Sequence, residues 1–243
     1  LEEAARGSSA LVQSAVASYS EIRDEKIIAT SDGAYTQLTD VKPTLRVMAA
    51  AERGGEVMTG TESLGITGEL PELLRLYPAA AMAEKAARSA VDLLAAPYPE
   101  GGESTVILEP SLVGLLSHEA IGHTVEADFV LAGSIAQGKI GLRVASPLVT
   151  MVDSGVPTLG DAPAGILPVD DEGGEAHRTV IIQDGVLRSY LHNRETATLF
   201  GVEPTGNGRA FEYSDEPLIR MRNTYIEPGT MTREELIEGT AEG

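Results

Sequence analysis

The 243-residue sequence contains no cysteine. A disulfide framework is therefore excluded, and so is any thiolate metal ligand supplied by these residues. Tryptophan is also absent, and there are only three phenylalanines and seven tyrosines. The chain is long enough to bury a proper core, and with so few aromatic side chains that core must consist mainly of alanine, valine, leucine and isoleucine.

Basic residues are scarce relative to acidic ones. The sequence has 18 lysines and arginines against 37 aspartates and glutamates, which gives a formal net charge of −19 at pH 7. Binding to the backbone of DNA or RNA requires a positive surface, so the charge argues against a nucleic-acid partner. It argues equally against docking on an anionic membrane.

No apolar run reaches the roughly 18 residues that a transmembrane helix requires, and no signal peptide opens the sequence. We therefore expect a cytoplasmic protein without a membrane partner. The sequence begins at Leu1 inside a helix-like pattern and stops just after another, TREELIEGTAEG. We expect it to be part of a longer polypeptide, truncated at both ends.

The first part of the sequence combines helix-like and strand-like patterns. Residues 2–18 predict a helix with one buried face. Strand-like segments follow at 19–29, 34–39, 44–51 and 56–60, and Asp-Gly and Gly-Gly turns between them predict hairpins. Residues 71–96 predict a long helix, which Pro78 should kink or divide.

Residues 96–104, APYPEGGES, have the proline and glycine content of a linker. We therefore predict the remainder of an N-terminal α+β domain at 1–96, a linker at 97–104 and a second domain at 105–243 that lacks its C-terminal segment. In the second domain we expect strands at 105–108, 148–152, 179–182, 186–191 and 221–226, and a helix from about Ser111. The fold class is α+β, with antiparallel sheets and flanking helices.

Residues 117–128, SHEAIGHTVEAD, hold two of the four histidines. His118 and His123 are five residues apart, one more than the histidine pair on the helix of a typical zinc protease. A regular α-helix would separate them by about 140° around its axis. A π-type turn would bring them nearly into line, and such turns often mark functional sites. We therefore predict a π-bulge or distortion at about 118–123, where Gly122 weakens the helix.

Carboxylates accompany the two histidines. Glu119 stands where, in metal-dependent hydrolysis, a carboxylate takes a proton from the attacking water and passes it to the leaving amine. Glu126 and Asp128 are candidates for a further metal ligand or for partners of an imidazole N–H. The alternative is that the histidines line an ordinary helix and bind no metal.

Residues 118–128 resemble the HExxxH motif of the TldD/PmbA family, whose members were once called modulators of DNA gyrase. Later segments resemble the same family and follow in the same order: PVDDEGGEA (168–176), IIQDGVLRSYL (181–191), PTGNGR (204–209) and RMRNTYIEPG (220–229). The resemblance covers about residues 104–240.

The resemblance implies a cytoplasmic metallopeptidase that hydrolyses peptide bonds in unfolded or flexible peptides. It implies Zn²⁺ as the cofactor, His118 and His123 as its ligands, and Glu119 as the general base. It also implies a homodimer, or a heterodimer with a PmbA/TldE-like chain that lacks the metal motif. The intact motif makes this sequence similar to the metal-bearing partner.

The sequence departs from the family in one respect, because the family's third ligand is a cysteine near the C-terminus. Catalytic zinc normally takes three protein ligands. We therefore expect an incomplete and inactive fragment, unless Glu126 or Asp128 replaces the cysteine. The alternative function is a non-catalytic scaffold subunit of a TldD/TldE-type complex that binds a peptide or a partner chain.

The glycine-rich segment at 204–210, PTGNGRA, lacks the lysine and hydroxyl residue of a phosphate-binding loop. It predicts a tight loop that approaches a peptide substrate, with Asn207, Gly208 and Arg209 as candidate contacts. A surface salt bridge is the alternative for the arginine. The acidic segment at 170–177 predicts a turn, with a cation site as its alternative. We expect His177 and His192 to be structural or exposed.

Overall fold

The computed structural model describes residues 1–99, 101–156, 158 and 163–240. The chain forms two compact units. The first comprises Leu1–Glu25, Leu38–Gly101 and Ala162–Ala164, and the second comprises Lys26–Gln37, Gly102–Asp161 and Gly165–Gly243. The tip of the first hairpin thus belongs to the second unit. The domain boundary at 97–104 stays a prediction.

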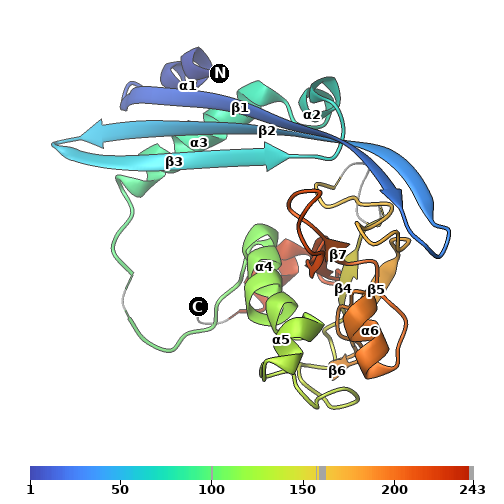
Figure 1. Ribbon diagram of the computed structural model, residues 1–243. Coiled ribbons are helices and arrows are strands. Elements are labelled where there is room, and N and C mark those ends of the chain that lie inside the picture. Colours follow the sequence, from blue (N-terminus) through green and yellow to red (C-terminus); the bar gives the residue numbers. More distant parts are fainter. Residues whose placement is uncertain (100, 157, 159–162, 241–243) are drawn as a thin grey trace. The chain divides into compact units, whose positions relative to one another are not determined.

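The first unit is built on a three-stranded sheet. Its elements are α1 (Glu2–Gly7), β1 (Val12–Ala29), β2 (Tyr35–Arg53), β3 (Glu56–Gly65), α2 (Leu70–Leu76) and α3 (Ala79–Leu93). The strands lie in the order β1-β2-β3, and β2 pairs antiparallel with β3 (Figure 1). Gly54 and Gly55 form the β2–β3 turn with φ of 65° and 92°, a backbone conformation that favours glycine.

The helix predicted at 2–18 is wrong, because α1 ends at Gly7 and β1 begins at Val12. The apolar residues of this segment fit both periods. Pairing with β2, which includes a bond from the Glu52 N–H to the Leu11 carbonyl, favours the strand. The division of the later helix at Pro78 is confirmed, because α2 ends at Leu76 and α3 begins directly after the proline.

Small side chains let α3 lie very close to the sheet. The buried face of α3 is made of Met82, Ala83, Ala86, Ala87 and Ala90. A Cβ added to Gly60 of β3 would lie only 2.1 Å from the Ala86 carbonyl oxygen, so no larger residue fits there. An alanine-rich core therefore replaces the aromatic residues that the sequence lacks.

The second unit carries the remaining elements. They are α4 (Pro110–Leu116), the π-helix η1 (Ser117–Gly122), the 3₁₀-helix η2 (His123–Val125), α5 (Ala127–Leu131), β4 (Met151–Ser154), β5 (Arg178–Gln183), β6 (Val186–Leu187), α6 (Arg194–Phe200), β7 (Gly208–Arg209), β8 (Leu218–Ile219), β9 (Asn223–Ile226) and α7 (Arg233–Glu238). An antiparallel sheet has the order β6-β5-β4-β9, and β7 pairs with β8. The α+β class with antiparallel sheets and flanking helices is confirmed.

Two details of this unit bear on the sequence predictions. The turn between β5 and β6 lies at Asp184 and Gly185, which both have positive φ, as an Asp-Gly hairpin requires. The strand predicted at 105–108 is wrong, because these residues pair with no strand of the described chain. Strand propensity alone does not form a strand when no neighbouring backbone supplies hydrogen bonds. No described helix is long and apolar enough to cross a bilayer.

Candidate metal centre

The histidine motif lies where one helix changes its winding. Helix α4 begins with Pro110 in its first turn, where a missing N–H costs nothing, and continues directly into η1. The His123 N–H donates to the His118 carbonyl, five residues back, which is the bond of a π turn. The predicted distortion is therefore confirmed, and it spans Ser117–Gly122.

The π turn brings both imidazoles to one face of the helix. Their ring centroids are 4.8 Å apart and the rings are nearly perpendicular, at 85°. Glu119 Oε2 lies 3.9 Å from His123 Nε2. One ligand atom from each of His118, Glu119 and His123 lies within 4.8 Å of the others. The side chains of His123 and Glu119 are 39% and 61% exposed, so a ligand can reach them from solvent.

These residues fit a zinc ion. Imidazole nitrogen and carboxylate oxygen are ordinary zinc donors at about 2.0–2.2 Å, which places the ligand atoms of a tetrahedral site roughly 3.5 Å apart. The observed separations reach 4.8 Å, about 1.3 Å more than that value. The two imidazole nitrogens therefore suit zinc, and two such ligands leave positions for others beside the Glu119 carboxylate.

Glu126 contacts the ring of the second histidine, His123. It is fully buried, and its Oε2 lies 3.0 Å from His123 Nδ1. An imidazole that donates from Nδ1 presents the lone pair of Nε2, the atom that faces Glu119. Burial raises the pKa of Glu126, and the His123 contact opposes that rise. Glu126 Oε1 has no hydrogen-bond partner among the described residues.

Asp128 has a different position. It lies in the first turn of α5, and its Oδ1 accepts a hydrogen bond of 2.9 Å from the Phe129 N–H. A carboxylate at a helix start interacts favourably with the free N–H groups there. Neither Asp128 nor Glu126 belongs to the converging group of His118, Glu119 and His123.

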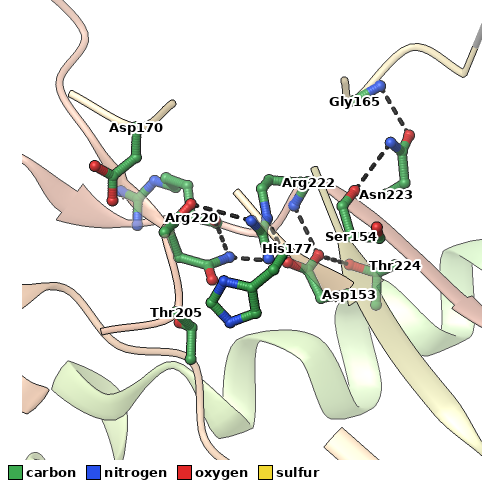
Figure 2. A network of polar contacts seen from close by, with 12 residues as sticks. Asp153, Ser154, Gly165, Asp170, His177, Thr205, Arg220, Arg222, Asn223 and Thr224 are labelled. Atoms are coloured by element: carbon green, nitrogen blue, oxygen red, sulfur yellow. Dashed lines mark hydrogen bonds and ion pairs between the residues drawn. The ribbon is translucent and has the colours of Figure 1, made fainter. Parts of the chain in front are cut away.

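A buried polar network fixes the backbone near the motif, and Figure 2 shows it from close by. Asp153 of β4 accepts hydrogen bonds from the Arg222 N–H at 2.8 Å and from Arg222 Nε at 2.9 Å. Thr224 Oγ1 and Asn207 Nδ2 donate to the same carboxylate, each at 2.9 Å. Asp153 and Arg222 are both fully buried at their side chains, so each neutralises the other's charge away from water.

The three candidate substrate residues belong to this framework. Asn207 is fully buried, and its Nδ2 also donates to the Arg220 carbonyl at 2.9 Å. The Gly208 N–H donates to Asp170 Oδ2 at 2.8 Å. Arg209 of β7 is partly buried, and that burial lowers its pKa. Of the three, Arg209 alone is not fully buried.

The acidic segment forms the predicted turn. Asp170 is buried and accepts backbone N–H bonds from Glu172, Gly174 and Gly208 at 2.7–3.1 Å. Gly173 has a φ of 80°, which favours glycine at that point of the turn. Three donors to one carboxylate offset the cost of burying this aspartate.

The two remaining histidines lie outside the metal centre. His192 is buried, its Nδ1 lies 3.2 Å from Thr196 Oγ1, and burial lowers its pKa to about 4. His177 is exposed. Sequence reasoning missed Asp153 and Arg222. The available signal was an acidic residue directly after the apolar strand predicted at 148–152, since a buried carboxylate requires a partner.

Models of two successive domains of one protein family match the chain. Residues 1–94 match the PmbA/TldA metallopeptidase central domain, and residues 101–243 match the PmbA/TldA metallopeptidase C-terminal domain. A protein of Methanothermobacter thermautotrophicus named metalloprotease is 36% identical over 233 residues, which are 96% of this chain and 50% of that protein. A zinc metalloprotease TldD homolog of Saccharolobus solfataricus is 40% identical over 145 residues, which are 60% of this chain and 32% of that protein.

Solved structures share the fold. A putative modulator of a DNA gyrase from Thermotoga maritima has a TM-score of 0.82 and 28% identity over 98% of this chain and 52% of its own. TldE from Thermococcus kodakarensis has a TM-score of 0.77 and 19% identity over 97% of this chain and 52% of its own, which shows the fold alone. The chain spans about half the length of the first relatives that it matches.

Proposed function

Because the chain belongs to the PmbA/TldD metallopeptidase family, we propose that it carries the metal centre of a zinc-dependent peptidase that acts on unfolded or flexible peptides. His118 and His123 hold the zinc ion, and Glu119 is the general base. The observation that carries this proposal is the π turn, which brings one ligand atom from each of these residues within 4.8 Å of the others on an accessible face.

The side chains divide the chemistry between them. A bound zinc ion supplies a Lewis acid that lowers the pKa of water and polarises a carbonyl. Glu119, 61% exposed at its side chain, takes a proton from the attacking water and delivers it to the leaving amine. Glu126 fixes the ring of His123 through Nδ1, so that Nε2 stays directed toward the metal position.

The third protein ligand is the open part of the proposal. The 243 residues contain no cysteine. Glu126 faces His123 Nδ1 and Asp128 accepts from a backbone N–H, so both have other partners. We propose that the ligand comes from outside these residues, and we expect the 243-residue chain alone to bind zinc weakly and to hydrolyse peptides poorly.

The first experiment measures bound zinc per chain by elemental analysis. The 243-residue chain and a form of the protein extended to the length of its relatives are compared. About one zinc in the extended form and less in the short one supports an external ligand. One zinc in both identifies a carboxylate of this chain as the third ligand. No zinc in either contradicts the peptidase.

A second experiment tests the role of Glu119 in the extended form. Glu119→Gln keeps the size of the side chain but removes the base, so we expect zinc content to stay and peptide hydrolysis to fall at least about 100-fold. Glu203→Gln, at an exposed position, is the matched control and should keep full activity. If Glu119→Gln cleaves peptides at the normal rate, the assigned base is wrong.

Peptide contacts are proposed for residues 207–209. Arg209 supplies a partly buried cation suited to a substrate carboxylate or carbonyl, and the buried Asn207 and Gly208 fix the loop that carries it. Arg209→Ala should raise KM for peptides more than it lowers kcat. An unchanged KM would leave the arginine with a structural role only.

The oligomer is a further part of the proposal. The chain forms a homodimer or pairs with a PmbA/TldE-like chain in the cytoplasm, and the acidic charge of −19 disfavours nucleic acid as a partner. Light scattering after size exclusion, alone and with such a chain added, separates these cases. A monomer under both conditions would contradict the pairing.

A non-catalytic scaffold subunit is the second candidate, and the lack of cysteine favours it for these residues. A scaffold would bind peptides equally well after His118→Ala and would contain no zinc. A peptidase would lose its zinc in the same variant. The two candidates are therefore separated by comparing zinc content and peptide affinity between the wild-type protein and this variant: a loss of zinc on substitution supports the peptidase, and a wild-type protein without zinc whose peptide affinity is unchanged by the substitution supports the scaffold.

A further inference from the structure

We propose that Met221 is a positioning residue for the metal centre, because its thioether packs against the π turn and holds that turn in the form that aligns the two histidines. The inference rests on the proposed function and adds to it a residue that lies about 100 positions further along the sequence. Met221 is 4% exposed and belongs to the core of the second unit.

The contact is made with Gly122. A Cβ added to this glycine would lie 1.9 Å from the Sδ atom and 3.0 Å from the Cε atom of Met221. Gly122 has an ordinary helical φ of −52°, so conformational freedom does not explain the glycine. Space does, because only a residue without a side chain lets the methionine reach the helix backbone at this point.

The position of the contact gives it its consequence. Gly122 is the last residue of η1 and directly precedes His123, whose N–H donates to the His118 carbonyl. If the turn changed from π to α winding, the residues after it would rotate around the helix axis. The rotation would be a large part of the roughly 100° that separates successive residues of an α-helix. The glycine would then leave the thioether, and a residue with a side chain would face it. Packing against Met221 therefore disfavours the α-helical form.

Hydrogen bonds fix the backbone on both sides of Met221. The Arg220 N–H donates to the Asn207 carbonyl at 2.9 Å, and the Arg222 N–H donates to Asp153 Oδ1 at 2.8 Å. Figure 2 shows both arginines in the network around Asp153. A methionine side chain is flexible in itself, but this one starts from a backbone that is fixed by buried hydrogen bonds. The network thus supports the π turn through one side chain.

A nuclear Overhauser experiment on histidine-labelled protein tests the geometry without any metal. The rings of His118 and His123, 4.8 Å apart between centroids, should give a cross-peak in the wild-type chain. Met221→Ala should weaken this cross-peak at least several-fold. Leu187→Ala is the matched control, because Leu187 is 2% exposed in the same core. It lies in β6, at the opposite end of the sheet from β9, the strand that begins two residues after Met221. A folded Met221→Ala chain with an unchanged cross-peak would overturn the proposal.

Zinc affinity, measured by competition with a chromophoric chelator, is the second readout. Met221→Ala should bind zinc at least about 10-fold more weakly, the usual effect of losing a residue that orients ligands. Gly122→Ala should also weaken binding, but much less in the Met221→Ala background, where the sulfur that the new methyl group meets is gone. Strictly additive effects would contradict the contact as the cause.

The two readouts separate this inference from the proposed function. If the wild-type chain shows the cross-peak and Met221→Ala loses it, but neither binds zinc, the positioning role stands and the metal centre fails. If both chains bind zinc equally, the metal centre stands and the role of Met221 fails. Met221→Leu keeps the buried volume and replaces the alanine variant if that variant does not fold. We expect its His118–His123 cross-peak to be weaker than that of the wild-type chain. A cross-peak of wild-type intensity would count against the proposal.

Discussion

At the scale of single residues, burial decides what each ionisable group can do. Glu119 is largely exposed to solvent, whereas Glu126 of the same motif is buried and contacts His123. In the sequence both are acidic neighbours of a histidine, and nothing there indicates which is exposed and which is buried. Burial depends on contacts with distant segments, such as the pairing of Glu126 with Leu191.

The buried His192 should make stability depend on pH. Burial lowers its pKa from 6.5 to about 4, so between these values the unfolded chain takes up a proton that the folded chain refuses. Stability is therefore full above pH 6.5 and falls as the pH drops toward 4, by up to about 3 kcal/mol. Urea unfolding across this range should show that His192→Phe loses this part of the pH dependence. His177→Asn, at an exposed histidine, should keep the wild-type profile, and an identical slope in all three chains would refute the assignment.

Two ion pairs should contribute very different amounts to the free energy of unfolding. Asp153→Asn leaves the buried Arg222 without a counter-charge, and we expect it to lower the free energy of unfolding by about 3 kcal/mol or more. Glu227→Gln breaks the Arg178–Glu227 pair, whose side chains are 37% and 38% exposed, and should cost less than about 1 kcal/mol. Chemical denaturation measures both, and equal losses would show that the Asp153 network does not anchor the unit.

At the scale of elements, the sequence predicts turns well and strand extents poorly. Asp-Gly and Gly-Gly pairs marked the hairpins, because positive φ restricts the residue types locally. The pattern favours a helix at 12–18 and a strand at 105–108, and both expectations fail because the pairing partner of a strand is decided elsewhere in the chain. The π turn was predictable, since two histidines five apart cannot meet on a regular helix. The network from Asp153 to Arg222 was not, since nothing local connects residues 69 positions apart.

The approach of α3 to the sheet can be tested at Gly60. An added methyl group would lie 2.1 Å from the Ala86 carbonyl oxygen, so Gly60→Ala must push the helix away and should cost about 1–3 kcal/mol. Gly7→Ala is the control, because no atom lies within 4 Å of the added methyl group, and it should be neutral or slightly stabilising. Thermal unfolding monitored by circular dichroism compares the two, and a neutral Gly60→Ala would contradict the close packing.

At the scale of the whole molecule, the proposed metal centre should couple to stability. The proposed zinc site exists only in the folded chain, so free zinc at 100 times its Kd should add about 2.7 kcal/mol to the free energy of unfolding. A chelator should remove this gain in the wild-type chain. His118→Ala should respond to neither addition, and a zinc effect that survives in this variant would place the ion elsewhere.

The bond between Asp153 and Arg222 has a consequence for how the protein is made. It closes a loop of 69 positions, and pairings this distant form late because chain closure precedes any gain from contact. During synthesis the histidines leave the ribosome well before Met221 and strand β9 exist. A nascent chain therefore carries the metal-binding sequence without the support that shapes it. The proposed zinc site would therefore become complete only once Met221 and strand β9 have folded against the π turn.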